Sequence, residues 1–217
     1  MLRFDHVIAA VPDLDVAGDL VRSTFGWGTV GHGRHPGGTQ NTAIPLGGEQ
    51  YLELLAVYDD ALPTGADVAR HLSGGPGWFG WVVQDDDLDG TAAHLGLTVR
   101  EGSIETADGR RGTWRIAGWE EARASGGGLP FFIDYGADRA AERAAVWADR
   151  YLEAAHLVAP VGIAWIAVGL DESTLRRSLG DANLDVRATS GKGLRAVGIR
   201  LEDGRVVEVD DQSWGGV

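Results

Sequence analysis

The sequence has no cysteine and little positive charge. Without cysteine, disulfide bonds, thiolate metal sites and cysteine nucleophiles are excluded. The 217 residues include 32 Asp and Glu against 19 Lys and Arg, which gives a formal net charge of −13. This balance argues against nucleic-acid partners, which are bound through their phosphates, and against adhesion to an anionic membrane surface.

Several sequence signals are also missing. No apolar run approaches the length of a membrane span, and the first residues lack the charged start, apolar stretch and cleavage site of a signal peptide. We therefore expect a cytoplasmic protein. No phosphate-binding glycine loop, Gly-x-Ser-x-Gly motif or paired-histidine zinc helix occurs, and we expect no nucleotide cofactor.

Glycine and tryptophan are abundant instead, with 33 and 8 residues in a chain that is 44% hydrophobic. The length suits one domain of roughly 200 residues or two of about 100, each able to bury a core. Glycines spread between apolar segments indicate many tight turns between short strands. The composition therefore favours a β-rich fold.

One pattern occurs three times along the chain. An apolar strand leads into an acidic turn suited to capping a helix, and the short helix that follows ends at a glycine. The three strands are expected at residues 3–11, 77–84 and 161–168, and the glycines are Gly26, Gly96 and Gly180. Further strand-like segments follow each helix, joined by turns at Gly47-Gly48, Asp108-Gly109 and Asp203-Gly204.

This repetition predicts an α+β fold of repeated βαβββ units. The first unit is expected at residues 1–60, the second at 61–136 and the third at 161–217. Residues 137–160 then bridge the second and third units with an amphipathic helix over 138–156, on which Trp147 and Tyr151 lie one turn apart and Arg143 lies elsewhere on the surface.

Two polar side chains share strand faces with apolar neighbours. Because side chains alternate along a strand, His6 shares a face with Ile8, and Glu53 shares a face with Leu55. A buried carboxylate is costly unless it is paired or bound to a metal. If the first and last strands of the unit lie close together, His6 and Glu53 form half of a nitrogen–oxygen metal site. The alternative for His6 is a structural, hydrogen-bonded histidine.

Four segments carry a more specific pattern: DHVIAAVPDLD at residues 5–15, GRHPGGTQN at 33–41, YLELLAV at 51–57 and LPFFIDY at 129–135. Together they resemble the glyoxalase-like domain proteins of the vicinal-oxygen-chelate superfamily. The resemblance covers the first two predicted units well and the third loosely. It implies cupped mixed β-sheets with helices on the outside and one small-molecule pocket between paired units.

The resemblance also implies a divalent metal ion, held by one His or Glu from the first and last strands of each unit. By position, the first unit supplies His6 and Glu53. The second supplies Asp134 on its closing strand, but Gly80 stands where its first-strand ligand belongs. The implied metal set is therefore His6, Glu53 and Asp134, with His35 or His156 as candidates to complete it.

The remaining candidates would contact the ligand. His35 lies in a glycine-rich loop and is either a ligand-binding residue or a turn residue that precedes proline. His156 follows a predicted helix, where its alternative role is to interact with the helix dipole. Of the tryptophans on or beside predicted strands, Trp78 and Trp119 are expected to line the pocket, and the others to be core.

Two function hypotheses follow. The first is a lyase or isomerase acting on a small oxygenated compound, in which the metal stabilises an enolate-like intermediate and Glu53 or Asp134 also serves as base. The second is a small-molecule binding protein without turnover, as in antibiotic-resistance members of the superfamily. Gly80 favours the second hypothesis, whereas His6 and Glu53 favour the first, which we prefer. A homodimer is compatible with such cupped units, although no residue decides it.

Overall fold

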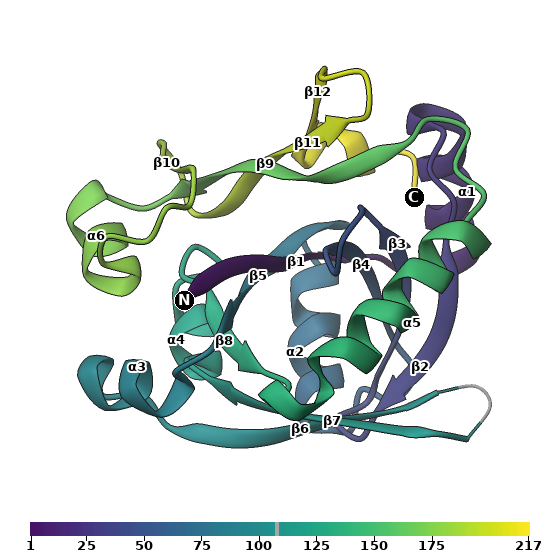
Figure 1. Ribbon diagram of the computed structural model, residues 1–217. Helices are drawn as coiled ribbons and strands as arrows, with labels where there is room; N and C mark the ends of the chain where they lie inside the picture. The colour runs from purple at the N-terminus through teal and green to yellow at the C-terminus, as the bar shows by residue number, and fades with distance from the viewer. Residues whose placement is uncertain (107–108) are drawn as a thin grey trace.

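The structure, a computed structural model, describes residues 1–106 and 109–217. The turn expected at Asp108-Gly109 includes Asp108, which lies outside the described residues. Eight strands form a closed barrel in the order β1-β4-β3-β2-β6-β7-β8-β5 (Figure 1). In chain order they are β1 (Leu2–Ala10), β2 (Val30–His35), β3 (Thr39–Pro45), β4 (Tyr51–Val57), β5 (Gly77–Asp85), β6 (Val99–Thr106), β7 (Arg111–Ala117) and β8 (Phe131–Asp134).

The barrel consists of two halves with the same plan. In the first half β1 is followed by helix α1 (Leu14–Phe25) and pairs in parallel with β4; in the second, β5 is followed by α3 (Leu88–Leu95) and pairs in parallel with β8. A short helix α4 (Trp119–Ala124) precedes β8. The halves join where β1 pairs antiparallel with β5 and where β2 pairs with β6. The predicted α+β class with repeated βαβββ units and cupped mixed sheets is confirmed.

The acidic turns and glycines form helix caps, as the sequence pattern predicted. The Asp13 side chain accepts hydrogen bonds from the backbone at the start of α1, and Asp87 does the same for α3. Both helices end at glycines in the left-handed conformation, Gly26 with φ 75° and Gly96 with φ 70°. Asp171 caps α6 (Glu172–Leu179) in the same way.

A second sheet contains β9 (Pro160–Gly169), β10 (Val186–Ala188), β11 (Gly193–Leu201) and β12 (Val206–Asp210). Its element order resembles that of a barrel half, but its strand order is β10-β9-β11-β12, so its first strand does not pair with its last. In Figure 1 this sheet lies against one side of the barrel. Residues such as Ile166 and Val197 join Val7 and Leu52 in one buried core, so this sheet covers the outer face of β1 and β4.

Two helices lie near the ends of the barrel. Helix α2 (Pro63–Leu72) buries Val68 in a cluster with Ile8 and Leu55. After a short 3-10 turn, Ala137–Arg139, helix α5 (Ala140–Glu153) crosses the barrel opening (Figure 1). This is the helix expected over residues 138–156. Among the described residues, no helix is both long and apolar enough to cross a membrane.

Candidate active site

A cavity of about 590 Å³ lies between the barrel and α5. Strands from both halves form its walls, and Arg143, Val146, Trp147 and Arg150 of α5 cover it. These four positions follow the i, i+3, i+4, i+7 spacing of one helix face. Because one chain supplies both halves and the cover, the walls of this cavity are built without a second subunit.

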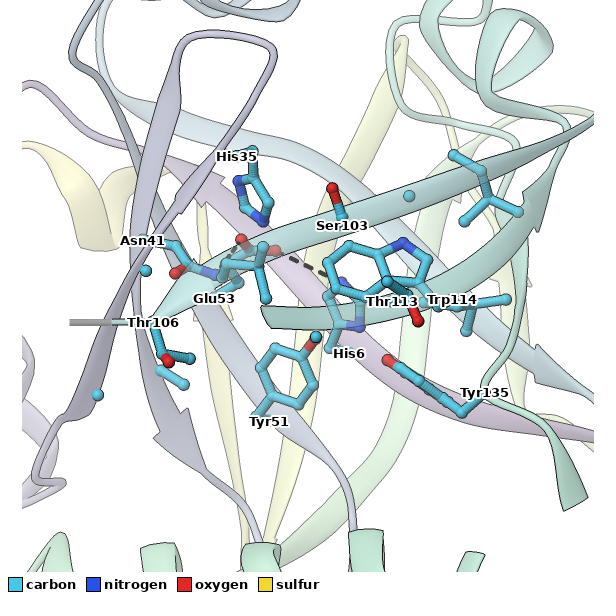
Figure 2. Close-up of a pocket in the computed structure, with 18 of the residues that line it drawn as sticks. His6, His35, Asn41, Tyr51, Glu53, Ser103, Thr106, Thr113, Trp114 and Tyr135 are labelled. Atoms are coloured by element: carbon cyan, nitrogen blue, oxygen red, sulfur yellow. Dashed lines mark hydrogen bonds and ion pairs between the residues drawn. The ribbon is translucent and has the colours of Figure 1, made fainter. Parts of the chain in front are cut away.

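His6 and Glu53 meet inside this cavity (Figure 2). The β1–β4 register places Ile8 opposite Glu53 and His6 opposite Tyr51, so the two polar side chains are diagonal neighbours on one face. His6 Nε2 lies 3.4 Å from Glu53 Oε2, and both side chains are at most 6% exposed. Asn41 on β3 donates a 2.7 Å hydrogen bond to Glu53 Oε1.

Asp5 lies on the other side of His6, although strict alternation would place it on the opposite face of β1. The pairing of β1 with β5 shifts register between Phe4 and His6. Such an irregularity places consecutive side chains on the same side of a strand. The Asp5 carboxylate therefore reaches His6, with 2.5 Å between Asp5 Oδ1 and His6 Nδ1.

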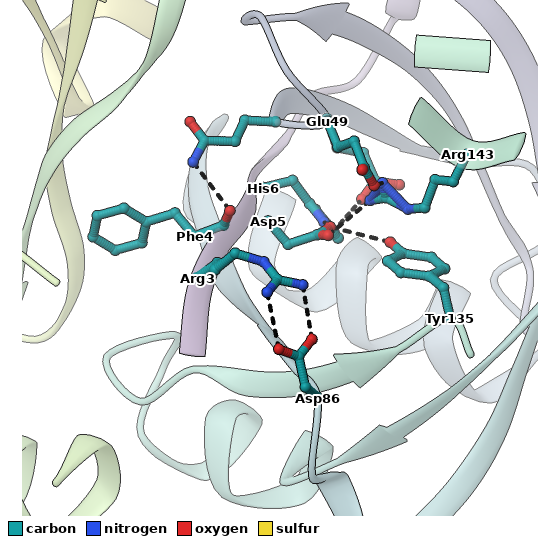
Figure 3. Close-up of polar contacts among 10 residues, drawn as sticks. Arg3, Phe4, Asp5, His6, Glu49, Asp86, Tyr135 and Arg143 are labelled. Carbon is teal, nitrogen blue, oxygen red and sulfur yellow. Dashed lines mark hydrogen bonds and ion pairs between the residues drawn. The ribbon is translucent and has the colours of Figure 1, made fainter. Parts of the chain in front are cut away.

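Asp5 is itself held by residues from other elements (Figure 3). Arg143 of α5 donates to Asp5 Oδ2 at 2.7 Å and to Glu49 at 2.7 Å, and Tyr135 donates to Asp5 Oδ1 at 3.1 Å. The Arg143 side chain is 9% exposed and lies on the same face of α5 as Trp147, whereas the sequence pattern predicted a position elsewhere on the helix surface. Two carboxylates compensate its buried charge.

Aromatic rings continue this network. The His6 imidazole stacks on Tyr51 with ring centroids 4.3 Å apart, and Tyr51 stacks on Trp147 of α5 at 4.4 Å. Burial raises the pKa of Tyr51 and Tyr135, and the charge of Asp5 acts in the same direction. Both phenols therefore stay protonated at neutral pH. Helix α5, which covers the cavity, is thus linked to His6 in two ways: through Asp5 and through Tyr51.

The three buried ionisable groups stabilise one another's charged forms. Burial opposes charge on each, but hydrogen bonds to Asp5 and Glu53 outweigh it and raise the pKa of His6. Hydrogen bonding to His6 and the imidazolium charge likewise keep the pKa of Asp5 and of Glu53 below their ordinary values, despite burial. These shifts favour the imidazolium form of His6 between two carboxylates.

The structure places two of the three predicted ligand-binding residues beside the cavity. His35 and Trp119 both line it. His35 Nδ1 lies 3.0 Å from Thr39 Oγ1, and burial lowers the pKa of this imidazole, which leaves it neutral. Trp78 is not among the lining residues; it is 3% exposed and packs edge-on against Trp214. His156 accepts a hydrogen bond from the Gly28 backbone and does not line the cavity.

Asp134 is not brought together with His6 and Glu53. Ile133 and Tyr135 line the cavity, so alternation turns Asp134 to the other face of β8. There its carboxylate accepts from the Gly136 backbone at 2.8 Å and lies 3.9 Å from Arg115. The alternation in LPFFIDY was the signal that separates Asp134 from the cavity.

The strand register shows which residues of the second half correspond to His6 and Glu53. Val82, like Ile8, stands five residues before the aspartate that caps the next helix. Ile8 is opposite Glu53, and Val82 is opposite Phe131, so Phe131 is the counterpart of Glu53. Gly80 is the counterpart of His6. The second half therefore presents a glycine and an apolar ring at these two positions.

The family resemblance implies a divalent metal ion held by His6, Glu53 and Asp134. Among the side chains that the structure describes, no three His, Asp or Glu groups are placed to hold one ion. His6 Nε2 and Glu53 face each other, but a metal ligand must be deprotonated, and the flanking carboxylates favour the proton on His6. The described residues do not fit an ion held by His6, Glu53 and Asp134.

The fold and its cavity agree with a comparison of the sequence with known families. The model of a family described as "Glyoxalase-like domain" matches residues 4–180. The chain belongs to this glyoxalase-like family. It is thereby a member of the vicinal-oxygen-chelate superfamily, as the sequence motifs predicted. No curated protein matches the sequence.

Solved structures resemble this glyoxalase-like protein to different extents. A hypothetical protein from Staphylococcus aureus superposes with a TM-score of 0.60 at 15% identity, covering 97% of this chain and 86% of its own. At this identity it shows a shared fold alone. Methylmalonyl-CoA epimerase from Streptomyces coelicolor, in complex with 2-nitronate-propionyl-CoA, has a TM-score of 0.46 at 21% identity and covers 62% of this chain and 98% of its own.

Proposed function

We propose that this glyoxalase-like cavity is the active site of an isomerase or lyase that moves a proton beside a carbonyl group of a small oxygenated substrate. The observation that carries this proposal is the buried His6–Glu53 pair, which faces the cavity with Glu53 Oε2 and His6 Nε2 3.4 Å apart. Asp5 hydrogen-bonds to His6, and Asn41 hydrogen-bonds to Glu53. Buried acid–base groups with shifted pKa values in a cavity are typical of catalytic sites.

In this proposal Glu53 is the base. Its carboxylate accepts the proton from the carbon beside the carbonyl, and the C–H electron pair moves toward the carbonyl oxygen to give an enolate. His6, as an imidazolium, donates a hydrogen bond from Nε2 to that oxygen. Return of the proton to a different position gives an isomerase, whereas loss of a leaving group from the neighbouring carbon gives a lyase. No step is assigned to a metal ion.

Hydrogen–deuterium exchange tests the proposal without a known turnover assay. The protein is incubated in D₂O with a panel of small 2-oxo and 2-hydroxy carbonyl compounds, and NMR follows loss of the proton beside the carbonyl. We expect exchange with at least one compound, and Glu53→Gln should slow it by about 10²- to 10⁴-fold. Asp134→Asn is the matched control, and we expect its rate to stay within about twofold because its carboxylate faces away from the cavity.

The alternative function is binding without turnover, and the aromatic lining of the cavity favours it. Six aromatic side chains line the space: Tyr51, Trp114, Trp119, Phe131, Tyr135 and Trp147. Such walls bind flat ligands through stacking and burial alone. If a compound binds tightly but its proton does not exchange, this alternative replaces the enzymatic proposal. If Glu53→Gln exchanges as fast as the unmodified protein, Glu53 is not the base.

A further inference from the structure

The charges that line the cavity differ from those of the chain as a whole. The chain carries 32 acidic against 19 basic residues, but five arginines and three glutamates line the cavity. The arginines are Arg100, Arg111, Arg139, Arg143 and Arg150. A cavity lined by an excess of one charge attracts ligands of the opposite charge.

Two of these arginines are already neutralised by partners. Arg143 lies between Asp5 and Glu49, and Arg100 forms an ion pair with Glu120. In the described part of the chain, Arg111, Arg139 and Arg150 have no carboxylate partner. Glu101 and Glu142 also line the cavity, but neither forms an ion pair with these three arginines. Three guanidinium groups are therefore available to a ligand.

Arg150 is the best positioned of the three. It lies on the cavity face of α5, one turn from Trp147, and its guanidinium lies over the Trp147 ring, 5.0 Å from the centroid. Stacking of this kind fixes the plane of a guanidinium while its N–H groups stay available. Trp147 in turn stacks on Tyr51, and Tyr51 stacks on His6. Arg150 thus lies at one end of a row of rings that leads to the proposed catalytic pair.

Arg139 and Arg111 lie at the β6–β7 wall. Arg139 Nη1 is 3.4 Å from Thr113 Oγ1, and Arg111 Nη2 is 3.4 Å from Ser103 Oγ. Ser103 and Thr113 are opposite each other in the β6–β7 ladder. The two guanidinium groups are therefore brought toward one pair of hydroxyls, and a shared anion would relieve the repulsion between them.

We infer that the molecule this cavity takes is a small organic carboxylate, whose negative group is bound by the cavity arginines that have no carboxylate partner while its body lies among the aromatic rings. This names the substrate class of the proposed enzyme and rests on that proposal for what happens at His6 and Glu53. Arginine binds carboxylates with paired, charge-assisted hydrogen bonds. The cavity volume of about 590 Å³ lies in the range of small-molecule sites.

Matched acids and esters test the inference. Benzoylformate, mandelate and benzoate are each compared with their methyl esters, which keep the ring but lose the charge. Affinity is measured by quenching of tryptophan fluorescence and by calorimetry. We expect at least one acid to bind about tenfold or more tightly than its ester, and its affinity to fall as salt increases. Arg139→Gln combined with Arg150→Gln should weaken that acid about 10- to 100-fold and leave the ester unchanged.

Arg177→Gln is the control, because Arg177 is an exposed residue on α6 that does not line the cavity. It removes one positive charge from the chain and should change neither affinity. The inference is overturned if no acid of the series binds more tightly than its ester, including the case in which none binds. It is also overturned if the double variant weakens acid and ester equally. Binding is measured without turnover, so a failure of Glu53→Gln to slow exchange would reject the proposed reaction and leave this result intact.

Discussion

The two halves of the barrel share a plan of helices and strands but differ in what they present to the cavity. The first half contributes three buried ionisable groups, of which His6 lies within ion-pair distance of both Asp5 and Glu53. At the positions that correspond to His6 and Glu53, the second half has Gly80 and Phe131. Tyr135 of the second half hydrogen-bonds to Asp5. The other side chains by which the second half lines the cavity include Trp114 and Ile133.

This difference shows how one supersecondary unit serves two tasks. A buried charge has to be paired, so the three ionisable groups of the first half depend on each other and on Arg143. Apolar rings have no such requirement and can be exchanged for others of similar size. In the function proposed above, the first half would supply the acid–base pair His6 and Glu53, and the second half would supply much of the surface that contacts the ligand.

The largest effect is expected when the second half is given the nitrogen donor that it lacks at Gly80. A side chain added at Gly80 meets no atom within 4 Å of its Cβ. Gly80→His would place an imidazole beside the β1 strand that carries His6, and with Glu53 the three groups form a two-histidine, one-carboxylate set. We expect Zn²⁺ or Ni²⁺ to bind about 100-fold or more tightly than to the unmodified protein, as measured by calorimetry.

Gly80→Ser is the matched control, because it adds a side chain without an imidazole. Affinity in Gly80→His should also rise with pH, since the metal competes with the proton on His6. Equal metal affinities in the two variants, or an affinity that survives His6→Gln in the Gly80→His background, would show that the two halves are not equivalent in the way their register indicates.

A smaller effect is expected from substitution of two aspartates, Asp5, which contacts His6, and Asp134, which faces away from the cavity. Asp5→Asn removes the carboxylate 2.5 Å from His6 Nδ1 and should move the His6 titration, followed by NMR of the imidazole, to lower pH. Asp134→Asn should leave that titration where it is, because Asp134 faces Arg115 on the outside of β8. If both substitutions move the midpoint equally, the pKa of His6 reflects the net charge of the chain and not its neighbour.

The sequence was sufficient for the repeated βαβββ units that form the barrel and for part of the site. Alternation correctly placed His6 and Glu53 on the cavity faces of their strands, and the acidic turns correctly marked the starts of α1 and α3. These are local properties of strands and helix caps. Asp134 lies apart from His6 and Glu53, on the face of β8 opposite the cavity-lining side chains of Ile133 and Tyr135.

Other parts of the site depend on contacts between distant segments. Asp5 reaches His6 through an irregularity in the β1–β5 pairing, which no pattern within β1 reveals. Arg143 and Trp147 share a helix face, but the sequence does not say that this face covers a cavity. The strand order of the second sheet likewise depends on packing against the barrel, because its element order alone fits either arrangement.

The smallest expected effect is on stability as a function of pH, and it separates the halves by charge alone. The raised pKa of His6 stabilises the fold fully below its ordinary value of 6.5, and this contribution is lost as pH rises through the folded-state pKa. The lowered pKa values of Asp5 and Glu53 stabilise the fold above their ordinary values of 3.8 and 4.5, and these contributions are lost as pH falls through the folded-state values. The cluster should therefore contribute most between about pH 4.5 and 6.5.

Thermal unfolding tests this window. The Tm of the unmodified protein should decline above it, and this decline should be weaker in His6→Gln. Phe131→Leu in the uncharged half should lower Tm by a similar amount at every pH. A His6→Gln profile parallel to that of the unmodified protein on the alkaline side would place the titrating group elsewhere.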